Sequence, residues 1–338
     1  MLSASTRLQR VSTRPGEAGE QQFGSLEAIG SSPRRRALVI VNPYATTVSD
    51  RLHTLVLSAL ASRYDVEAIE TRARGHATEI SANAADGDYD MIVAFGGDGT
   101  VNEVANGLVG SPIPLTALPG GSANVFCKLL GIPSEIVDAT EHLLALADRW
   151  QPRAVDLGLV DGRYYTFSAG IGIDASVVRE VDARPSLKRR FGPNFFLASA
   201  LWTFGRHYLL SPPRMRVAVG RETLTGVTAI VQNGEHYTYF NDHPIDLAQG
   251  AALDSGTLAG IVLHRGSLFD APSLLLRGLA NSGRISGHRQ VSQFATSDAV
   301  SVTSADGRPL PLQLDGDYVG EVTEVRFTIS TGALQVIA

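Results

Sequence analysis

Cysteine is nearly absent from the sequence, and neither sign of charge dominates it. A single cysteine, Cys127, among 338 residues excludes an intrachain disulfide framework and a metal site built from several cysteines. This usage suits a reducing compartment, so we expect a cytoplasmic protein. With 29 Lys and Arg residues against 34 Asp and Glu, the formal net charge is −5, which gives no support for a nucleic-acid partner.

Long apolar runs are also missing. No run approaches the length that a helix needs to span a bilayer, and the N-terminal stretch lacks the apolar core of a signal peptide. Any membrane contact is therefore expected to be peripheral. Hydrophobic residues still make up 44% of the chain, and its length exceeds that of a usual single core, so two domains are predicted.

Residues 1–35 are rich in Ser, Arg, Gly, Glu and Gln and show no periodicity, so they are predicted to form a disordered tail. Arg34, Arg35 and Arg36 lie at its end. This triplet could hold anionic lipid, although a solvated tail end before a strand is the more ordinary interpretation.

The chemically most constrained stretch is Phe95–Gly107, with the sequence FGGDGTVNEVANG. It follows an apolar run of buried-strand type and precedes a segment that reads as a helix. Glycines at a strand-to-helix turn let a ligand approach the main-chain N–H groups, which attract anions. Asp98 in their midst would repel a bare phosphate, so a divalent cation or a hydroxyl proton is expected between them. The alternative is a tight turn in which Asp98 caps the helix.

This stretch is one of four similar units in the first half. Buried strands, each followed by a polar or glycine-rich turn and a helix, are predicted at Ala37–Val41, Asp65–Glu70, Asp90–Phe95 and Pro114–Leu118. Because such turns converge on one edge of an open α/β sheet, they predict a nucleotide site with Asn42 and Ala45 among its contacts.

The second half has a different pattern. After a helix at Glu135–Ala147 and a boundary near Trp150–Pro152, short strands follow one another without long helices, which argues for an antiparallel sandwich. These strands are predicted at Ala154–Val160, Tyr164–Ala169, Arg214–Val219, Gly226–Val231, Thr257–Leu263, Val300–Thr303, Gln313–Leu314 and Val322–Ile329.

Five motifs, taken in order, resemble the diacylglycerol kinase catalytic family, which includes bacterial diacylglycerol and lipid kinases, sphingosine kinases and ceramide kinases. They are Val41–Pro43, Gly75–Ala77, Gly96–Glu103, Leu118–Asn124 and Asp315–Asp317. The resemblance implies an α/β nucleotide-binding domain at residues 36–151, to which the last strands at 325–338 return. It implies an antiparallel β-sandwich domain for the lipid substrate at residues 152–324.

The resemblance also implies an activity: ATP-dependent transfer of the γ-phosphoryl group to a primary hydroxyl of diacylglycerol or a similar lipid, with Mg²⁺. Such chemistry needs amides and a metal for the phosphates and a carboxylate for the proton of the nucleophile. Asp98 would organise Mg²⁺. The implied nucleotide contacts are Asn42, Pro43, Ala45, Thr71, Gly97, Asp98, Gly99, Thr100, Asn102, Glu103, Gly121 and Ser122.

Asp317 is the implied general base. Asp315-Gly316-Asp317 by itself signals only a turn, but it resembles the family's Asp-Gly-Glu, whose last carboxylate is taken to accept the proton of the lipid hydroxyl. Since Asp is one methylene shorter than Glu, either the backbone at 317 lies closer to the reacting atoms or a water intervenes.

Three further residues carry weaker expectations. Asp174, in the segment Gly170–Ala175, is a candidate substrate contact, although a Gly-x-Gly between strands is often only a bulge. Asp254 is a candidate ligand of a structural Mg²⁺, because Ser255 stands where the family has an Asp and a hydroxyl is a poor replacement. His76 either touches phosphate or caps the helix at Ala77.

A basic and aromatic segment between Arg179 and Arg221 suits docking on an anionic membrane surface, where the lipid substrate would be met. The alternative is a helix packed with its rings toward the core. A homodimer is a further expectation. Two other functions stay open: an NAD kinase-like enzyme, although no Thr-Pro-Thr-Gly-Ser type segment occurs, and a catalytically silent nucleotide- or lipid-binding regulator, supported by Ser255 and Asp317.

Overall fold

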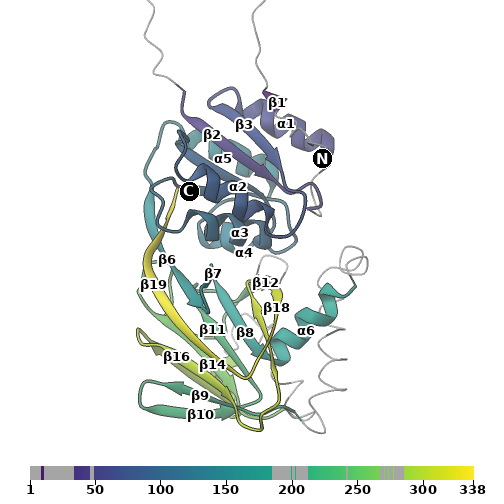
Figure 1. The fold of residues 1–338 in the computed structure, drawn as a ribbon, viewed down its shortest axis with the longest axis vertical. Coiled ribbons are helices and arrows are strands. Elements are labelled where there is room, and N and C mark those ends of the chain that lie inside the picture. The colour runs from purple at the N-terminus through teal and green to yellow at the C-terminus, as the bar shows by residue number, and fades with distance from the viewer. Residues whose placement is uncertain are drawn as a thin grey trace, which may run out of the picture.

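The computed structural model describes residues 9–10, 34–45, 49–184, 199, 202, 212–240, 243–266, 270, 273, 277 and 285–338. The chain forms two lobes, an α/β lobe at the top of Figure 1 and a β-rich lobe below it. The predicted fold class is confirmed: the N-terminal part is mixed α/β and the C-terminal part is an antiparallel β structure. No helix in the described part of the chain is long and apolar enough to cross a membrane.

The α/β lobe is built on four parallel strands in the order β3 (Asp65–Glu70), β2 (Arg36–Val41), β4 (Met91–Gly96) and β5 (Leu115–Pro119). Strands β4 and β5 are buried along their whole length, as expected for a parallel sheet covered on both faces. Five helices follow the strands: α1 (Asp50–Leu60), α2 (His76–Ala84), α3 (Asp98–Leu108), α4 (Val125–Leu129) and α5 (Ile136–Leu146).

Of the predicted tail, the structure describes Gln9–Arg10 and residues 34–35. Gln9–Arg10 form the short strand β1, which pairs antiparallel with β3 at the edge of the sheet. The rest of residues 1–33 lies outside the described residues. The disordered character of the tail therefore stays a prediction.

The β-rich lobe contains two layers of strands. One is a six-stranded antiparallel sheet in the order β15 (Val291–Thr296), β14 (Leu258–Leu263), β11 (Thr228–Gln232), β8 (Ser168–Gly172), β17 (Leu310–Leu314) and β18 (Asp317–Val322). The other contains β6 (Arg153–Val160), β7 (Arg163–Tyr165), β9 (Met215–Val219), β10 (Glu222–Gly226), β16 (Val300–Ser304) and β19 (Glu324–Val336). Their apolar faces share one core, in which the rings of Tyr165 and Phe327 meet edge to face at 6.4 Å.

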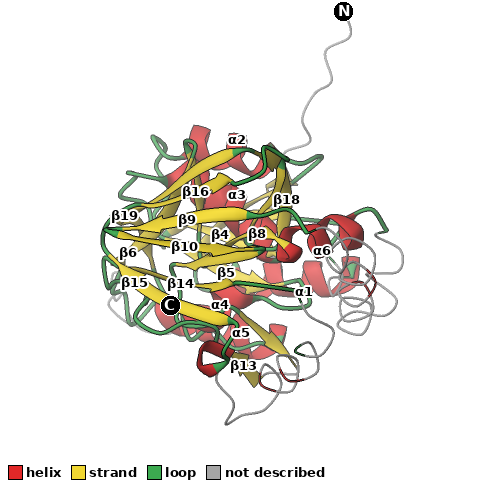
Figure 2. Cartoon of the chain, turned by 90° about the horizontal axis from the view of Figure 1, so that it is seen from below, coloured by secondary structure: helices red, strands yellow, loops and turns green. Residues whose placement is uncertain are grey.

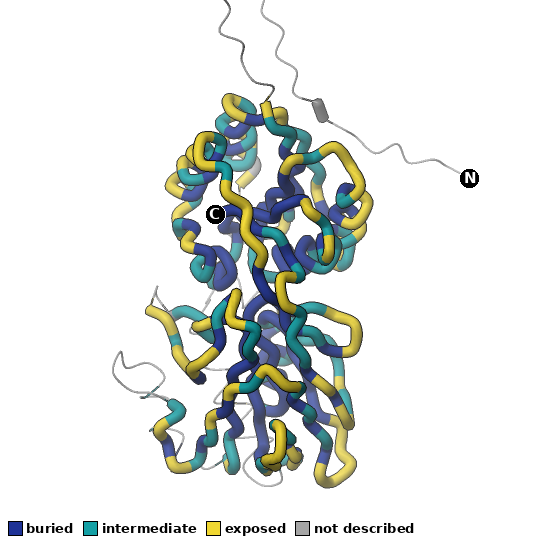
Figure 3. Tube along the Cα trace, turned by 90° about the vertical axis from the view of Figure 1, so that its left-hand side faces the viewer, coloured by how far each residue is buried: buried dark blue, intermediate teal, exposed yellow. Residues whose placement is uncertain are grey.

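The long strand β19 joins the two lobes. It pairs antiparallel with β16 and β6, and at Val336 it pairs parallel with Leu115 of β5, so one sheet continues from the lower lobe into the upper one. Buried segments run through the middle of both lobes in Figure 3. The return of the chain end to the first sheet is observed, while the domain limits at 151/152 and 324/325 stay predictions.

Several elements differ from the sequence-based expectations. The predicted strand Tyr164–Ala169 is divided into β7 and β8, and the helix α6 (Ile173–Asp182) was not predicted. Helix α6 contacts β17 and β18 and lies beside the strands of the lower lobe in Figure 2. The run Gly170–Ile173 has the apolar and glycine content of a strand, which hid the helix start. Short strands β12 (Thr238–Phe240) and β13 (His243–Ile245) and the 3-10 turn Ile285–Gly287 complete the described elements.

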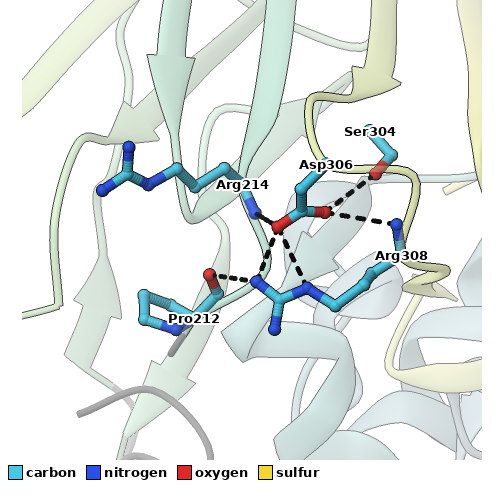
Figure 4. A network of polar contacts seen from close by, with 5 residues as sticks. All are labelled: Pro212, Arg214, Ser304, Asp306 and Arg308. Atoms are coloured by element: carbon cyan, nitrogen blue, oxygen red, sulfur yellow. Dashed lines mark hydrogen bonds and ion pairs between the residues drawn. The ribbon is translucent and has the colours of Figure 1, made fainter. Parts of the chain in front are cut away.

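The basic and aromatic segment lies mostly outside the described residues, since 185–198, 200–201 and 203–211 are not described. Its far end is anchored by a polar network around Asp306, shown in Figure 4. The Asp306 carboxylate accepts hydrogen bonds from the Arg308 guanidinium and from the backbone N–H groups of Arg308 and Arg214. These bonds hold the β16–β17 loop against the chain that enters β9.

Candidate active site

The two glycine-rich loops at the ends of β4 and β5 touch backbone to backbone. Gly120 N–H donates to the Gly96 carbonyl at 2.9 Å, and a Cβ on Gly121 would come within 2.8 Å of the Gly97 Cα. Asn124, with φ of 47°, closes the second loop by two 2.9 Å hydrogen bonds between its side-chain amide and the Gly121 backbone. A side chain at Gly121 would therefore clash with the neighbouring loop and one at Gly97 would be tight, so the contact between the loops favours glycine at both positions.

The other predicted nucleotide contacts lie at the same edge of the sheet, because β2, β3, β4 and β5 are parallel neighbours. Asn42, after β2, donates from Nδ2 to the Thr100 hydroxyl at 3.0 Å and accepts from Tyr44 N–H. Thr71, after β3, is buried and donates its N–H to the Val41 carbonyl. Pro43 and Ser122 are exposed and Ala45 is half-buried. The structure thus gathers these residues, and their contact with a nucleotide stays a prediction.

Asp98 joins the two glycine loops. It is the first residue of α3, while Gly97 occupies the N-cap position, so the alternative in which Asp98 caps its own helix is wrong. Its Oδ1 instead accepts the Phe126 N–H at 3.1 Å, at the start of α4. Burial raises the pKa of the Asp98 carboxyl to about 6, and the N–H groups of Phe126 and Val125 oppose this rise.

Asp317 reaches the first glycine loop from the other lobe. It is the first residue of β18, and its Oδ2 lies 2.9 Å from the point where a Cβ on Gly99 would stand. Its Oδ1 lies 3.3 Å from Nη2 of Arg74, in the turn after β3. The Asp317 carboxylate therefore lies beside the glycine loop, while the choice between a backbone closer to the reacting atoms and an intervening water stays a prediction.

Asp315 ties this turn to helix α3. Its carboxylate is buried and accepts hydrogen bonds from Asn102 Nδ2 at 2.8 Å, from the Thr166 hydroxyl and N–H, and from the N–H groups of Phe167 and Ser168. Burial raises the pKa of the Asp315 carboxyl, and the three N–H donors partly offset the rise. From the sequence, Asp315 was predicted only as part of a turn motif, whereas its hydrogen bonds in the structure make it the anchor of that turn.

Asn102 and Glu103, predicted as nucleotide contacts, have partners within the protein. Asn102 is buried and donates to Asp315 and to the Tyr164 carbonyl. The Glu103 carboxylate accepts the N–H groups of Gly75 and Ala77 at 2.8 and 3.1 Å, so it caps α2. His76 Nδ1 accepts the Arg72 N–H at 3.0 Å, and α2 begins at His76 with Gly75 at the N-cap position, so the alternative in which His76 caps the helix is wrong. These contacts give Asn102 and Glu103 supporting positions, and direct nucleotide contact through them stays a prediction.

Asp174 lies deeper in the lower lobe. On the first turn of α6, its Oδ2 accepts Gln313 Nε2 at 2.7 Å and its Oδ1 accepts the Tyr237 hydroxyl. Burial raises the pKa of the Asp174 carboxyl. The bulge alternative is wrong here, since Gly172 is followed by a helix. Gln313 also accepts the Gly316 N–H at 2.8 Å, which connects Asp174 to the turn of Asp317.

Asp254 is exposed, and no group of three or more His, Cys, Asp and Glu side chains able to hold a metal ion occurs among the described residues. A neighbouring carboxylate was missed: Asp156 is buried and accepts the N–H groups of Gly256 and Gly332 at 2.7 and 2.9 Å. The signal for it was a lone Asp inside the apolar strand Ala154–Val160. Asp156 thus holds the 252–257 loop against β19 by hydrogen bonds.

Comparisons of this chain with a family model and with known proteins all point to diacylglycerol kinases. Residues 36–160 match the family model of the diacylglycerol kinase catalytic domain. A diacylglycerol kinase from Staphylococcus carnosus (strain TM300) is 25% identical over 293 residues, covering 86% of this chain and 90% of the relative. A diacylglycerol kinase from Staphylococcus aureus (strain bovine RF122 / ET3-1) is 27% identical over 299 residues, covering 86% and 88%.

The fold has solved counterparts as well. A crystal structure of a diacylglycerol kinase from Bacillus anthracis str. Sterne superposes with a TM-score of 0.68 at 23% identity, covering 91% of this chain and 98% of that chain. The same two-lobed fold therefore accommodates a sequence that differs at most positions. This chain therefore contains a diacylglycerol kinase catalytic domain at residues 36–160, and over most of its length it is similar to proteins named diacylglycerol kinase.

Proposed function

We propose that this protein is an ATP-dependent lipid kinase that transfers the γ-phosphoryl group to a primary hydroxyl of diacylglycerol or a similar lipid. The observation that carries the proposal is the position of Asp317, whose carboxylate lies beside Gly99 in the first turn of α3. A helix N-terminus with glycine-rich backbone favours phosphate, and a carboxylate beside it can accept the proton of an incoming hydroxyl.

In this proposal the backbone of Gly97, Gly99 and Gly121 binds the nucleotide phosphates, because glycine leaves the main chain open to close approach. The hydroxyls of Thr100 and Ser122 add donors, and Asn42 and Thr71 lie toward the nucleoside. Helix α3 begins at Asp98, so its N-terminal end, where the Thr100 N–H donates to the Gly97 carbonyl, lies at the glycine loop.

Asp98 is the residue that would hold Mg²⁺. Magnesium is commonly bound through one or two protein carboxylates together with substrate phosphates, so a single half-buried Asp next to a phosphate loop suits it. When bound, the ion supplies positive charge against the phosphate oxygens. Asp254, exposed and next to Ser255, would be a weaker ligand.

The chemical step is a displacement at the γ-phosphorus. The acceptor oxygen forms a bond to phosphorus, the bond to the β–γ bridging oxygen breaks, and the hydroxyl proton passes to the Asp317 carboxylate. ADP and the phosphorylated lipid, phosphatidic acid or an analogue, are the products. Asp317 suits this role better than Asp98. The Asp98 carboxylate already accepts a hydrogen bond from the Phe126 N–H at the start of α4, and it would also bind the metal when that is present.

The test is phosphate transfer from radiolabelled ATP to a panel of lipids in mixed micelles, to NAD, and without acceptor. We expect a labelled lipid product, with Asp317→Ala lowering turnover by about 10² to 10⁴ at nearly unchanged ATP affinity. The matched control is Asp298→Ala, which removes an exposed carboxylate from a turn of the same lobe. Labelled NAD would identify an NAD kinase-like enzyme, and ATP binding without transfer to any acceptor would identify a silent regulator.

The proposal extends to the membrane. Lipid substrate would be met at an anionic surface, with the basic residues between Arg184 and Arg216 as the attraction; this part rests on their sequence alone. Replacing Lys188, Arg189 and Arg190 with Ser should weaken binding to anionic vesicles in a salt-dependent way while transfer to a short-chain soluble lipid survives. Equal loss on both substrates would place these residues in the fold or the active site.

A further inference from the structure

Arg74 and Asp317 form an ion pair between the two lobes. Arg74 lies in the turn that follows β3, and Asp317 opens β18, 243 residues later in the chain. The guanidinium Nη2 lies 3.3 Å from Oδ1, while Oδ2 of the same carboxylate lies beside Gly99. The two oxygens of Asp317 therefore have different neighbours, one basic side chain and one glycine backbone.

Both partners are fixed by neighbouring residues of helix α3. Glu103 accepts the N–H groups of Gly75 and Ala77 and so holds the turn that carries Arg74. Asn102 donates to Asp315 and so holds the turn that carries Asp317. One helix thus sets the spacing of the pair, which is the arrangement expected of a preorganised site.

The pair is too exposed to matter much for folding. The Arg74 and Asp317 side chains are 69% and 29% exposed, and ion pairs of this kind contribute little to stability because water screens them. The ion pair instead orients the Asp317 carboxylate, because a guanidinium is always charged and offers directed donors to a carboxylate. Holding Oδ1 from one side leaves Oδ2 directed at the glycine loop.

We propose that Arg74 is a positioning residue for phosphoryl transfer: it holds the Asp317 carboxylate directed at the first turn of α3. The inference rests on the proposed function, in which Asp317 accepts the proton of the acceptor hydroxyl. Arg74 acts through Asp317, so its removal affects the rate of transfer more than the binding of ATP.

The test is a double-mutant cycle on lipid phosphorylation with Arg74→Ala, Asp317→Ala and the double variant. Arg74→Ala should lower kcat by about 10²-fold, the loss expected when a reacting group is misplaced, and should change the KM for ATP by less than about threefold. Arg74→Lys should recover part of the loss. In the Asp317→Ala background, Arg74→Ala should cause no further loss. Arg72→Ala, which removes the same charge from the same turn, is the matched control and should retain wild-type kcat.

Each other outcome overturns the inference. A wild-type kcat in Arg74→Ala would mean that the ion pair has no part in phosphoryl transfer. If the fold-losses of kcat in the two single variants multiply in the double variant, Arg74 acts on the nucleotide independently of Asp317. A melting temperature lowered by more than about 5 °C in both Arg74 variants would make its role structural. All of these results leave the proposed function intact, because that function fails only if the wild-type protein transfers phosphate to no lipid.

Discussion

The carboxylate of Asp315 accepts a 2.8 Å hydrogen bond from the side-chain amide of Asn102, and this bond ties the turn of Asp317 to helix α3. The two residues come from different lobes and are 213 positions apart. Since α3 also begins with the glycine loop, one rigid element positions the phosphate-binding backbone and the proposed base together.

Asn102→Ala is therefore expected to lower both stability and turnover. It removes hydrogen bonds to a buried carboxylate and to the Tyr164 carbonyl, at a cost of about 1–3 kcal/mol. Asn106→Ala is the matched control, because Asn106 bonds to the Tyr164 backbone and to Asn102. Urea unfolding should show comparable losses in the two variants, while only Asn102→Ala should reduce kcat clearly. Equal kcat in the two would show that the bond to Asp315 does not serve catalysis.

Gly99→Ala is expected to separate stability from activity. The added Cβ would stand 2.9 Å from Asp317 Oδ2, so the carboxylate must move away from the loop. Because that carboxylate is the partly exposed end of a side chain, the fold can accommodate the shift, and Ala in a helix gains up to about 1 kcal/mol over Gly.

We expect kcat to fall by about 10²-fold in this variant while the melting temperature is unchanged or higher. Steady-state kinetics together with calorimetry would measure both. Turnover near the wild-type value would mean that the contact between Gly99 and Asp317 has no catalytic importance.

Asp98→Asn is expected to abolish activity and yet stabilise the metal-free protein at neutral pH. Folding raises the pKa of Asp98 from 3.8 to about 6, so the folded state binds the proton more tightly than the unfolded state does. The favourable contribution of this group is full below pH 4 and is lost as the pH rises through about 6.

Removing the charge should accordingly raise the free energy of unfolding by about 1–3 kcal/mol at pH 7 and by almost nothing at pH 4. Urea titrations in EDTA at the two pH values would measure this. The same gain at both pH values would show that burial of the charge is not its source.

The opposite pH dependence is expected of Asp306. Hydrogen bonds from Arg308 lower the pKa of its carboxyl from 3.8 to about 2, so the ionised form favours the folded state. This stabilisation is present above about pH 4 and is lost as the pH falls toward 2.

Because the pair is exposed, Asp306→Asn should cost less than about 1 kcal/mol at pH 7, and the difference from the wild type should vanish near pH 2. Asp298→Asn, in another exposed turn, should show no such trend. A difference that persists at pH 2 would mean that the loop in Figure 4 depends on shape and not on charge.

Local patterns in the sequence were sufficient to predict the parallel strands of the α/β lobe and the turns that follow them. The strand Asp65–Glu70 was predicted with its observed limits, and the glycine-rich turns were placed after the strands that carry them. Apolar runs, glycines and helix periodicity report the burial and backbone freedom of a residue, and these follow from its near neighbours along the chain. Helix α6 was missed for the same reason, because its start resembles a strand locally.

The arrangement of the site was decided by the tertiary structure. That Asp98 binds the start of α4, that Asp156 holds Gly256 and Gly332, and that Asp317 meets both Gly99 and Arg74 could not be read from any local pattern. A periodicity shows that a side chain is directed inward but not which distant residue it meets there. Only the pairing of β19 with β5 and β6, together with the anchoring of Asp315 by Asn102, brings the two lobes into register and makes these partners neighbours.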